Sequence, residues 1–142
     1  MSVSLVKTKE EIEKCFEVMV FLRPHLIKEE FVDKVHSQFD QGYQIACIFK
    51  DDNAVSLIGY RFLETMAWGR ILYIDDLITH PEHKKCGYAS QLLNWALAKA
   101  KQAQCDQVHL DSGYQRNDAH RLYLNKGFDM TSHHFSMLVN DI

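Results

Sequence analysis

The chain has 142 residues and a formal net charge of −3 at pH 7, with 46% hydrophobic and 25% charged residues. These are ordinary values for a folded domain, so they argue against a disordered chain, and the small negative charge gives no general attraction to nucleic acid or to an anionic membrane. We therefore expect one domain spanning residues 1–142, with neither nucleic acid nor membrane as a partner.

The chain is expected to open with one strand and two helices. Val3–Lys7 has a short strand pattern, and Thr8 with Glu11 forms a capping box for a helix that Pro24 closes. A second run of apolar residues at helical spacing is ended by Gly42.

Three strand-like runs rich in β-branched and aromatic residues follow these helices. They span Tyr43–Lys50, Val55–Thr65 and Ile71–Thr79. Asp51-Asp52-Asn53 supplies the turn of a hairpin between the first two, and Ala67-Trp68-Gly69-Arg70 interrupts the pattern before the third. The simplest prediction is an antiparallel meander.

The last third of the chain contains two more helices and two more strands. Ala89–Ala100 has one apolar stripe at helical spacing, and Val108–Asp111 is a short strand that the right-handed crossover rule places parallel to the preceding one. A helix at Asn117–Lys126 ends at Gly127, before a closing strand at Phe128–Val139. The expected fold class is α+β, with a mixed, mostly antiparallel sheet and helices on both faces.

The segment that leads into the third helix has the composition of an anion site. It reads Thr-His-Pro-Glu-His-Lys-Lys-Cys-Gly-Tyr-Ala from Thr79 to Ala89. The first N–H groups of a helix lack intrahelical partners, Gly87 has no Cβ, and Lys84 and Lys85 add positive charge. A ligand containing pyrophosphate is therefore predicted. A nucleoside triphosphate site is the weaker alternative, because the Gly-Lys-Ser/Thr ending of a P-loop is missing.

The order of short motifs around this turn resembles that of a known family. Lys84-x-x-Gly87-x-Ala89 is preceded by Leu77-x-Thr79-x-Pro81 and followed by Asn117-x-Ala119-x-x-x-Tyr123-x-x-x-Gly127-Phe128. Over nearly the whole chain this order resembles the GNAT superfamily of acetyl-CoA-dependent N-acetyltransferases. The family's turn begins with Arg or Gln, where this chain has Lys84.

The resemblance implies a GNAT-like sheet that is splayed between two central parallel strands, with acetyl-CoA as co-substrate. The pantetheine arm would enter the splay beside the third strand-like run, and the turn would hold the diphosphate. The residues implied to bind acetyl-CoA are Leu77, Ile78, Thr79, Lys84, Lys85, Cys86, Gly87, Tyr88, Ala89, Ser90 and Asn117. Asn117 is also suited to be a helix N-cap, and Cys86 is either a small spacer or a reactive thiol.

Two catalytic residues are expected, Tyr123 from the resemblance and Asp75 from the strand pattern. Tyr123 would return a proton to the departing thiolate, and the alternative is a core aromatic residue. Strand alternation places Asp75 on the same face as Leu77 and opposite to Asp76. Asp75 would attract a cationic amine or relay its proton, and a strand-end salt bridge is the open alternative. The N–H group of Leu77 would stabilise the charge on the thioester oxygen.

The acceptor is expected to be a primary amine of a small molecule. Acidic Glu64, Asp75 and Asp76 favour a cationic amine, and a protein lysine or N-terminus is the alternative. The implied pocket comprises Phe21, Arg23, His25, Phe31, Tyr60, Phe62, Glu64, Trp68 and His133. Two alternatives stay open: a catalytically silent module that senses acetyl-CoA, and dimerisation through the exposed closing strand.

The cysteine and histidine patterns predict neither disulfides nor a metal site. The four cysteines contain no Cys-x-x-Cys pair, and the first residues carry no apolar run of signal-peptide length, so a reduced, cytoplasmic protein is expected. His80-x-x-His83 and His133-His134 lack the Cys or carboxylate that would complete a tetrahedral set.

Overall fold

The protein was analysed as a computed structural model that describes residues 2–142, and these residues form two compact units. The first unit ends at Leu110 and contains a five-stranded sheet with three α-helices. The second unit spans Asp111–Ile142 and contains α4 and a 3₁₀ turn.

Helix α1 (Lys9–Leu22) begins and ends where the sequence predicts. The Thr8 hydroxyl accepts from the Glu11 N–H at 3.2 Å, and the Glu11 carboxylate accepts from the Thr8 N–H at 2.9 Å, which completes the capping box. Arg23 is the C-cap residue, and Pro24 follows it. A short turn then leads to α2 (Lys28–Phe39).

The sheet contains β1 (Val3–Leu5), β2 (Gln44–Lys50), β3 (Asn53–Thr65), β4 (Gly69–Thr79) and β5 (Gln107–Leu110), side by side in that order. The first four strands are antiparallel, and β5 runs parallel to β4. The predicted meander and parallel crossover are therefore confirmed.

The β2–β3 hairpin closes through a two-residue turn. Asp51 and Asp52 have φ angles of 51° and 67°, and Lys50 pairs with Asn53 across the turn. Positive φ at both central residues is the requirement of a type I′ turn, which aspartate tolerates better than most residues.

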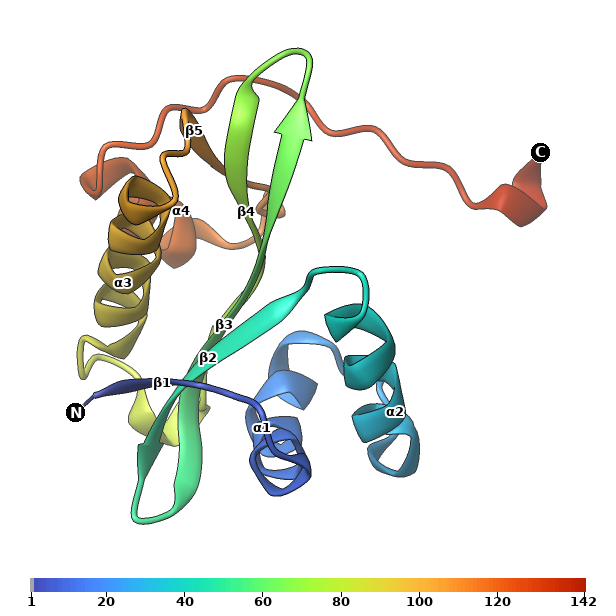
Figure 1. Ribbon diagram of the computed structural model, residues 1–142, viewed down its shortest axis with the longest axis vertical. Helices are drawn as coiled ribbons and strands as arrows, with labels where there is room; N and C mark the ends of the chain where they lie inside the picture. The colour runs from blue at the N-terminus through green and yellow to red at the C-terminus, as the bar shows by residue number, and fades with distance from the viewer. Residues whose placement is uncertain (1) are drawn as a thin grey trace. The chain divides into compact units, whose positions relative to one another are not determined.

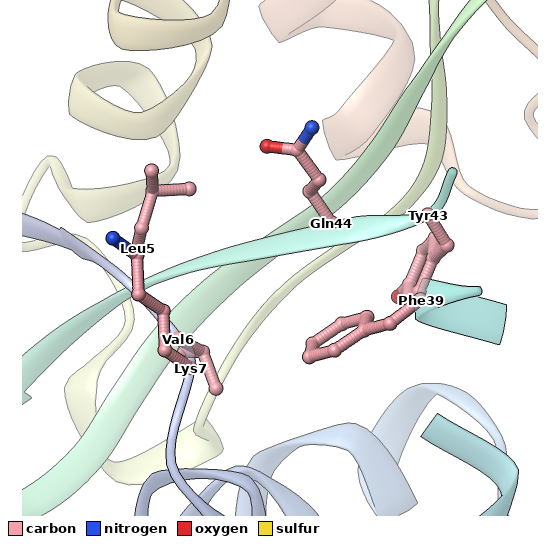
Figure 2. Close-up of a pocket in the computed structure, with 6 residues that line it drawn as sticks. All are labelled: Leu5, Val6, Lys7, Phe39, Tyr43 and Gln44. Atoms are coloured by element: carbon pink, nitrogen blue, oxygen red, sulfur yellow. The ribbon is translucent and has the colours of Figure 1, made fainter. Parts of the chain in front are cut away.

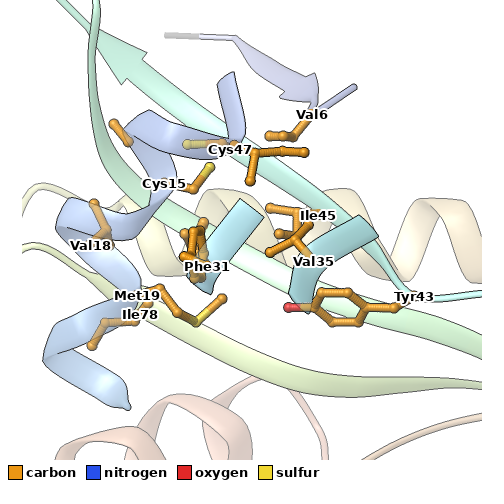
Figure 3. Close-up of a cluster of buried hydrophobic side chains, with 13 residues drawn as sticks. Val6, Cys15, Val18, Met19, Phe31, Val35, Tyr43, Ile45, Cys47 and Ile78 are labelled. Atoms are coloured by element: carbon orange, nitrogen blue, oxygen red, sulfur yellow. The ribbon is translucent and has the colours of Figure 1, made fainter. Parts of the chain in front are cut away.

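Helices cover both faces of the sheet in the first unit. Helices α1 and α2 lie against one face, and α3 (Tyr88–Gln102) lies against the other (Figure 1). The core under α1 and α2 includes Cys15, Met19, Phe31, Ile45 and Ile78 (Figure 3). Burial of these apolar surfaces is what holds the two helices on the sheet.

Strand β4 contains one residue more than β3 at the position of Asp75. Gly59 pairs with Asp76, whereas the next residue, Tyr60, pairs with Ile74, so Asp75 has no partner across the ladder. This is a β-bulge, which bends a strand and re-aims its side chains. The simple alternation expected for Asp75 and Asp76 is therefore interrupted at this position.

The closing strand predicted at Phe128–Val139 is wrong. In the second unit, α4 (Asn117–Asn125) ends at Gly127 with φ of 100°, as predicted, and residues 128–138 then form no helix or strand. Their apolar side chains, such as Phe135, are exposed. Alternating apolar residues form a strand only when a neighbouring strand accepts their hydrogen bonds, and none pairs with them within residues 2–142. As a result, β5 is the last strand of the sheet instead of a central one.

Candidate functional site

The C-terminal half of β4 has an open edge. The parallel ladder with β5 ends at the pair Ile74–Leu110, whereas β4 continues from Asp75 to Thr79. Beyond that pair, β4 has a ladder partner on the β3 side only, within the described part of the chain. We refer to residues 75–79 as the open edge.

Backbone groups of two residues point toward the open edge. The His80 N–H donates to the Val55 carbonyl on β3 at 2.8 Å, and the Ile78 carbonyl accepts from the Ser56 hydroxyl at 3.1 Å. Because backbone groups alternate in direction along a strand, those of Leu77 and Thr79 point away from β3. They are available to pair with an extended ligand, as a neighbouring strand would be.

The turn after the open edge carries two residues in the left-handed region. Lys85 has φ of 63° and Gly87 has φ of 81°, and α3 begins at Tyr88. No described side chain caps the start of α3. Successive N–H groups in such a turn form a concave site for anions, and the helix dipole adds to its attraction. The residues present therefore fit a diphosphate group.

Gly87 has a conformational role besides the predicted one of letting a ligand approach the main chain. A Cβ added at Gly87 would meet no atom within 4 Å, so nothing in the protein crowds this position. The left-handed φ is the feature that favours glycine here. The neighbouring Lys84, Lys85 and Cys86 are exposed, and the Cys86 thiol donates to the Lys84 carbonyl at 3.6 Å.

A second group of residues lies on the face of β4 that α1 and α2 cover. Arg23 donates from Nε to Asp76 at 3.1 Å and from Nη2 to the Asp75 carbonyl at 2.9 Å. Arg61 makes a bidentate pair with Asp75 at 3.1 and 2.8 Å, and its guanidinium lies over the Tyr43 ring. The Tyr43 hydroxyl donates to Asp76 at 2.6 Å. We call these five residues the acid–arginine cluster.

The cluster overturns the expectation that Asp75 and Asp76 point to opposite faces. The Asp76 carboxylate accepts from Tyr43, and the Asp75 carboxylate pairs with Arg61, whose guanidinium lies over the same Tyr43 ring. The two carboxylates lie together because the bulge breaks the alternation. Gly59 leaves space for the cluster, since an added Cβ would lie against the Tyr43 hydroxyl and 2.7 Å from Asp76 Oδ2. The salt-bridge alternative for Asp75 is thus observed.

Burial dominates the electrostatics of the cluster. It raises the pKa of the Asp75 carboxyl, while the hydrogen bonds and charge of Arg61 oppose that shift. Burial, followed by the charge of Asp76, raises the pKa of the Tyr43 phenol well above its usual value. Tyr43 therefore acts as a hydrogen-bond donor at neutral pH.

The second unit contains the other predicted site residues. Tyr123 lies on α4 with its ring 6.0 Å from that of Phe128, between centroids. Burial raises the pKa of its phenol, and the charge of Arg116 acts in the opposite direction. Such a phenol stays protonated at neutral pH, as a proton donor must. Asn117 is the first residue of α4, and Arg116 occupies the N-cap position, so the N-cap alternative for Asn117 is wrong.

The implied acceptor-pocket residues do not form one group. Phe31 is in the core against Phe16, and Tyr60 is buried against Trp95, where burial raises its pKa to about 12. Trp68 stacks on His109. A separate, mostly apolar pocket is lined by Leu5, Val6, Lys7, Phe39, Tyr43 and Gln44 (Figure 2). It shares only Tyr43 with the acid–arginine cluster.

Sequence reasoning missed the role of Arg61 and Tyr43. The signal that points to them is the pair of adjacent carboxylates, Asp75 and Asp76, in an otherwise apolar strand. Buried carboxylates need cationic or hydrogen-bonding partners, so the pair predicts such groups nearby. Which residues supply them depends on register and on the bulge.

The described residues, 2–142, contain neither a cluster of metal-ligating side chains nor a membrane-spanning helix. No group of three or more His, Cys, Asp or Glu side chains is placed to hold a metal ion. No helix there has the length and apolar character needed to cross a bilayer.

Comparison with known proteins gives matches over most of the chain. The model of the acetyltransferase (GNAT) family matches residues 6–128. The uncharacterized N-acetyltransferase YhdJ of Bacillus subtilis (strain 168) is 31% identical over 130 residues, which cover 90% of this chain and 92% of YhdJ. The aminoalkylphosphonate N-acetyltransferase of Salmonella typhimurium is 35% identical over 63 residues, which are 44% of this chain and 41% of that enzyme.

A solved structure has the same fold at low sequence identity. The aminoglycoside antibiotic 6′-N-acetyltransferase of Acinetobacter haemolyticus superimposes with a TM-score of 0.73. It is 16% identical, and the match covers 98% of this chain and 99% of that one.

Proposed function

The chain belongs to the acetyltransferase (GNAT) family, whose members transfer acetyl groups, and we propose that it moves an acetyl group from acetyl-CoA to the primary amine of a small molecule. The observation that carries this proposal is the open edge of β4, followed directly by the turn at Lys84–Gly87. The open edge supplies backbone groups for an extended arm, and the turn supplies N–H groups for a diphosphate.

The chain's own residues would divide the binding of acetyl-CoA between main chain and side chain. Leu77 and Thr79 would pair with the amide-containing arm through their backbone groups, as a parallel strand does. The N–H groups at the start of α3, with Lys84 and Lys85, would hold the phosphates. Asn117, exposed on α4, is proposed as a side-chain ligand of the same arm.

Bound acetyl-CoA supplies an activated thioester that an uncharged amine can attack. The Leu77 N–H is proposed to donate to the thioester oxygen, where negative charge develops. Tyr123 is proposed to give its phenolic proton to the leaving sulfur, a role that suits a phenol that stays protonated at neutral pH. Asp75 is proposed to accept the proton of the incoming ammonium through water, and the burial that raises its pKa makes it a stronger base than an exposed carboxylate.

A small-molecule acceptor is favoured by two of the similar proteins. Their names assign an aminoalkylphosphonate to one and an aminoglycoside to the other as acceptor. A protein acceptor is the alternative, and the same assay separates the two.

The experiment is a measurement of free CoA thiol released from acetyl-CoA during incubation with a panel of small amines and lysine-containing peptides. We expect turnover with small amines, and a kcat for Tyr123→Phe that is lower by on the order of 10²- to 10⁴-fold. The affinity of Tyr123→Phe for acetyl-CoA should stay unchanged. Turnover with peptides alone, or a Tyr123→Phe variant with wild-type kcat, would contradict the proposal.

A further inference from the structure

We propose that the acceptor amine carries an anionic group, a carboxylate or phosphonate, and that Arg23 binds that group. The inference rests on the proposed function and deepens it by naming the substrate class. It is carried by the way the acid–arginine cluster fixes the Arg23 guanidinium beside the open edge.

The position of Arg23 is determined by the end of α1. Arg23 is the C-cap residue, its N–H donates to the Met19 carbonyl at 2.9 Å, and Pro24 prevents the helix from continuing. Its side chain is held from the other end by Asp76 and by the Asp75 carbonyl. A guanidinium that is fixed before a ligand arrives loses little conformational entropy on binding.

Arg23 has unused hydrogen-bond donors, and its side chain is the most exposed of the cluster. Its hydrogen bonds within residues 2–142 use Nε and Nη2, which leaves the two hydrogens of Nη1. Its side chain is 43% exposed, whereas those of Asp76, Arg61 and Asp75 are between 12% and 23% exposed. A ligand that approaches the cluster therefore meets the outer side of a guanidinium.

The charges of the cluster argue against a polycationic acceptor. Asp75 and Asp76 are each paired with an arginine, so the four side chains sum to zero charge. The third acidic residue, Glu64, is highly exposed and lies 3.9 Å from Arg70. The cluster therefore offers no net negative charge to a polycationic acceptor, and its unused hydrogen-bond donors belong to the cationic side chain of Arg23.

The distance along β4 limits the size of the acceptor. Arg23 binds the backbone at Asp75, and Leu77 lies two residues further on, so the α-carbons of these two residues are roughly 7 Å apart along an extended strand. An amine that reacts beside Leu77 while its anion contacts Arg23 must span this distance. A spacer of two or three carbons between nitrogen and the acidic carbon or phosphorus fits, as in β-alanine or 3-aminopropylphosphonate.

The test compares β-alanine with its methyl ester, which keeps the amine and the chain but lacks the charge. We expect wild-type kcat/KM to be on the order of 10- to 100-fold higher for the acid, from the loss of charge-assisted hydrogen bonds. Arg23→Gln should raise KM for the acid by a similar factor and leave KM for the ester unchanged. Arg23→Lys should lie between them, because it keeps the charge without the planar fork. Lys9→Gln, which removes an exposed cation from the same helix, should match wild type.

Thermal unfolding of each variant checks that the fold is retained. A purely structural role for Arg23 would lower kcat equally for acid and ester, and that result would overturn the inference. Wild-type preference for the ester would also overturn it, even if no Arg23 variant folds, and would leave the proposed function standing. Release of CoA thiol with neither compound nor any other amine would overturn both.

Discussion

Strand β4 offers two binding surfaces of different construction, its open edge and the face that carries the acid–arginine cluster. At the edge, the groups available to a ligand are backbone N–H and C=O groups of Leu77 and Thr79. On the face, the groups are side chains from β3, from β4, from the residue that precedes β2 and from the C-cap of α1, fixed by hydrogen bonds between 2.6 and 3.1 Å.

The two surfaces depend on the amino-acid sequence in different ways. The edge needs only that β4 continues beyond the end of β5, so most side-chain changes there leave its hydrogen-bonding groups in place. The face depends on the identity of each member, because removing one leaves a charged or polar partner unpaired. Main-chain changes should therefore break the edge, and side-chain changes should break the face.

The largest expected effect comes from removing one N–H at the edge. Leu77→Pro should lower kcat by on the order of 10²- to 10³-fold, because it deletes the proposed donor to the thioester oxygen. The Leu77 N–H points away from β3, so the fold should tolerate proline there better than at Ile78.

Ile78→Pro is the matched control, since its N–H points toward β3. It should lose about 3 kcal/mol or more of stability in urea unfolding. Equal destabilisation by the two prolines, or full activity of Leu77→Pro, would contradict the orientation of the edge.

Adding a methyl group beside the acid–arginine cluster should lower the stability of the fold. Gly59→Ala should lower the free energy of unfolding by about 3 kcal/mol, because its Cβ would collide with the Tyr43 hydroxyl and press on Asp76. Gly42→Ala is the control, at a position with φ of 96° where an added Cβ meets nothing within 4 Å. It should cost only about 1 kcal/mol. Similar losses for both variants would show that the cluster is not tightly packed around Gly59.

A smaller effect is expected at the turn. Gly87→Ala should raise KM for acetyl-CoA by roughly 5-fold, which is about 1 kcal/mol, because alanine disfavours φ of 81° and shifts the N–H groups. The KM for the amine should not change. Unaltered KM for acetyl-CoA, measured at saturating amine, would contradict the phosphate role of this turn.

The smallest effect is a pH dependence of opposite sign at two carboxylates. Burial raises the pKa of Asp75 above 3.8, so its contribution to stability is fully present below pH 3.8 and is lost as pH rises through the folded value. Backbone hydrogen bonds from Thr8 and Lys7 lower the pKa of Glu11 below 4.5, so its contribution is present above pH 4.5 and is lost as pH falls through the folded value.

Urea unfolding between pH 3 and 7 measures both contributions. The stability of wild type relative to Asp75→Asn should fall as pH rises, and its stability relative to Glu11→Gln should increase by less than about 1 kcal/mol. The same sign for both variants would contradict the environments described here.

The edge could be predicted from sequence because its determinants are local. A glycine before an apolar helical pattern and a strand–helix–strand order are enough to place the turn and the parallel pair, and the structure confirms the elements on both sides of Gly87. The capping box at Thr8 and the end of α1 before Pro24 were predictable for the same reason.

The face could not be predicted, because it depends on register. The bulge at Asp75 changes the direction of both carboxylates, and no local residue pattern indicates a single extra residue in β4. The prediction of a closing strand was wrong for a related reason. Residues 128–138 have suitable alternation, but strand formation requires a partner that sequence periodicity does not specify.

Amide hydrogen exchange, measured by NMR with and without CoA, tests the binding of CoA by the main chain most directly. CoA is expected to slow exchange at Leu77, at Thr79 and at the first residues of α3, and to leave exchange at the paired amides of β2 unchanged. Binding of CoA without added protection at Leu77, at Thr79 or at the start of α3 would contradict binding by the main chain.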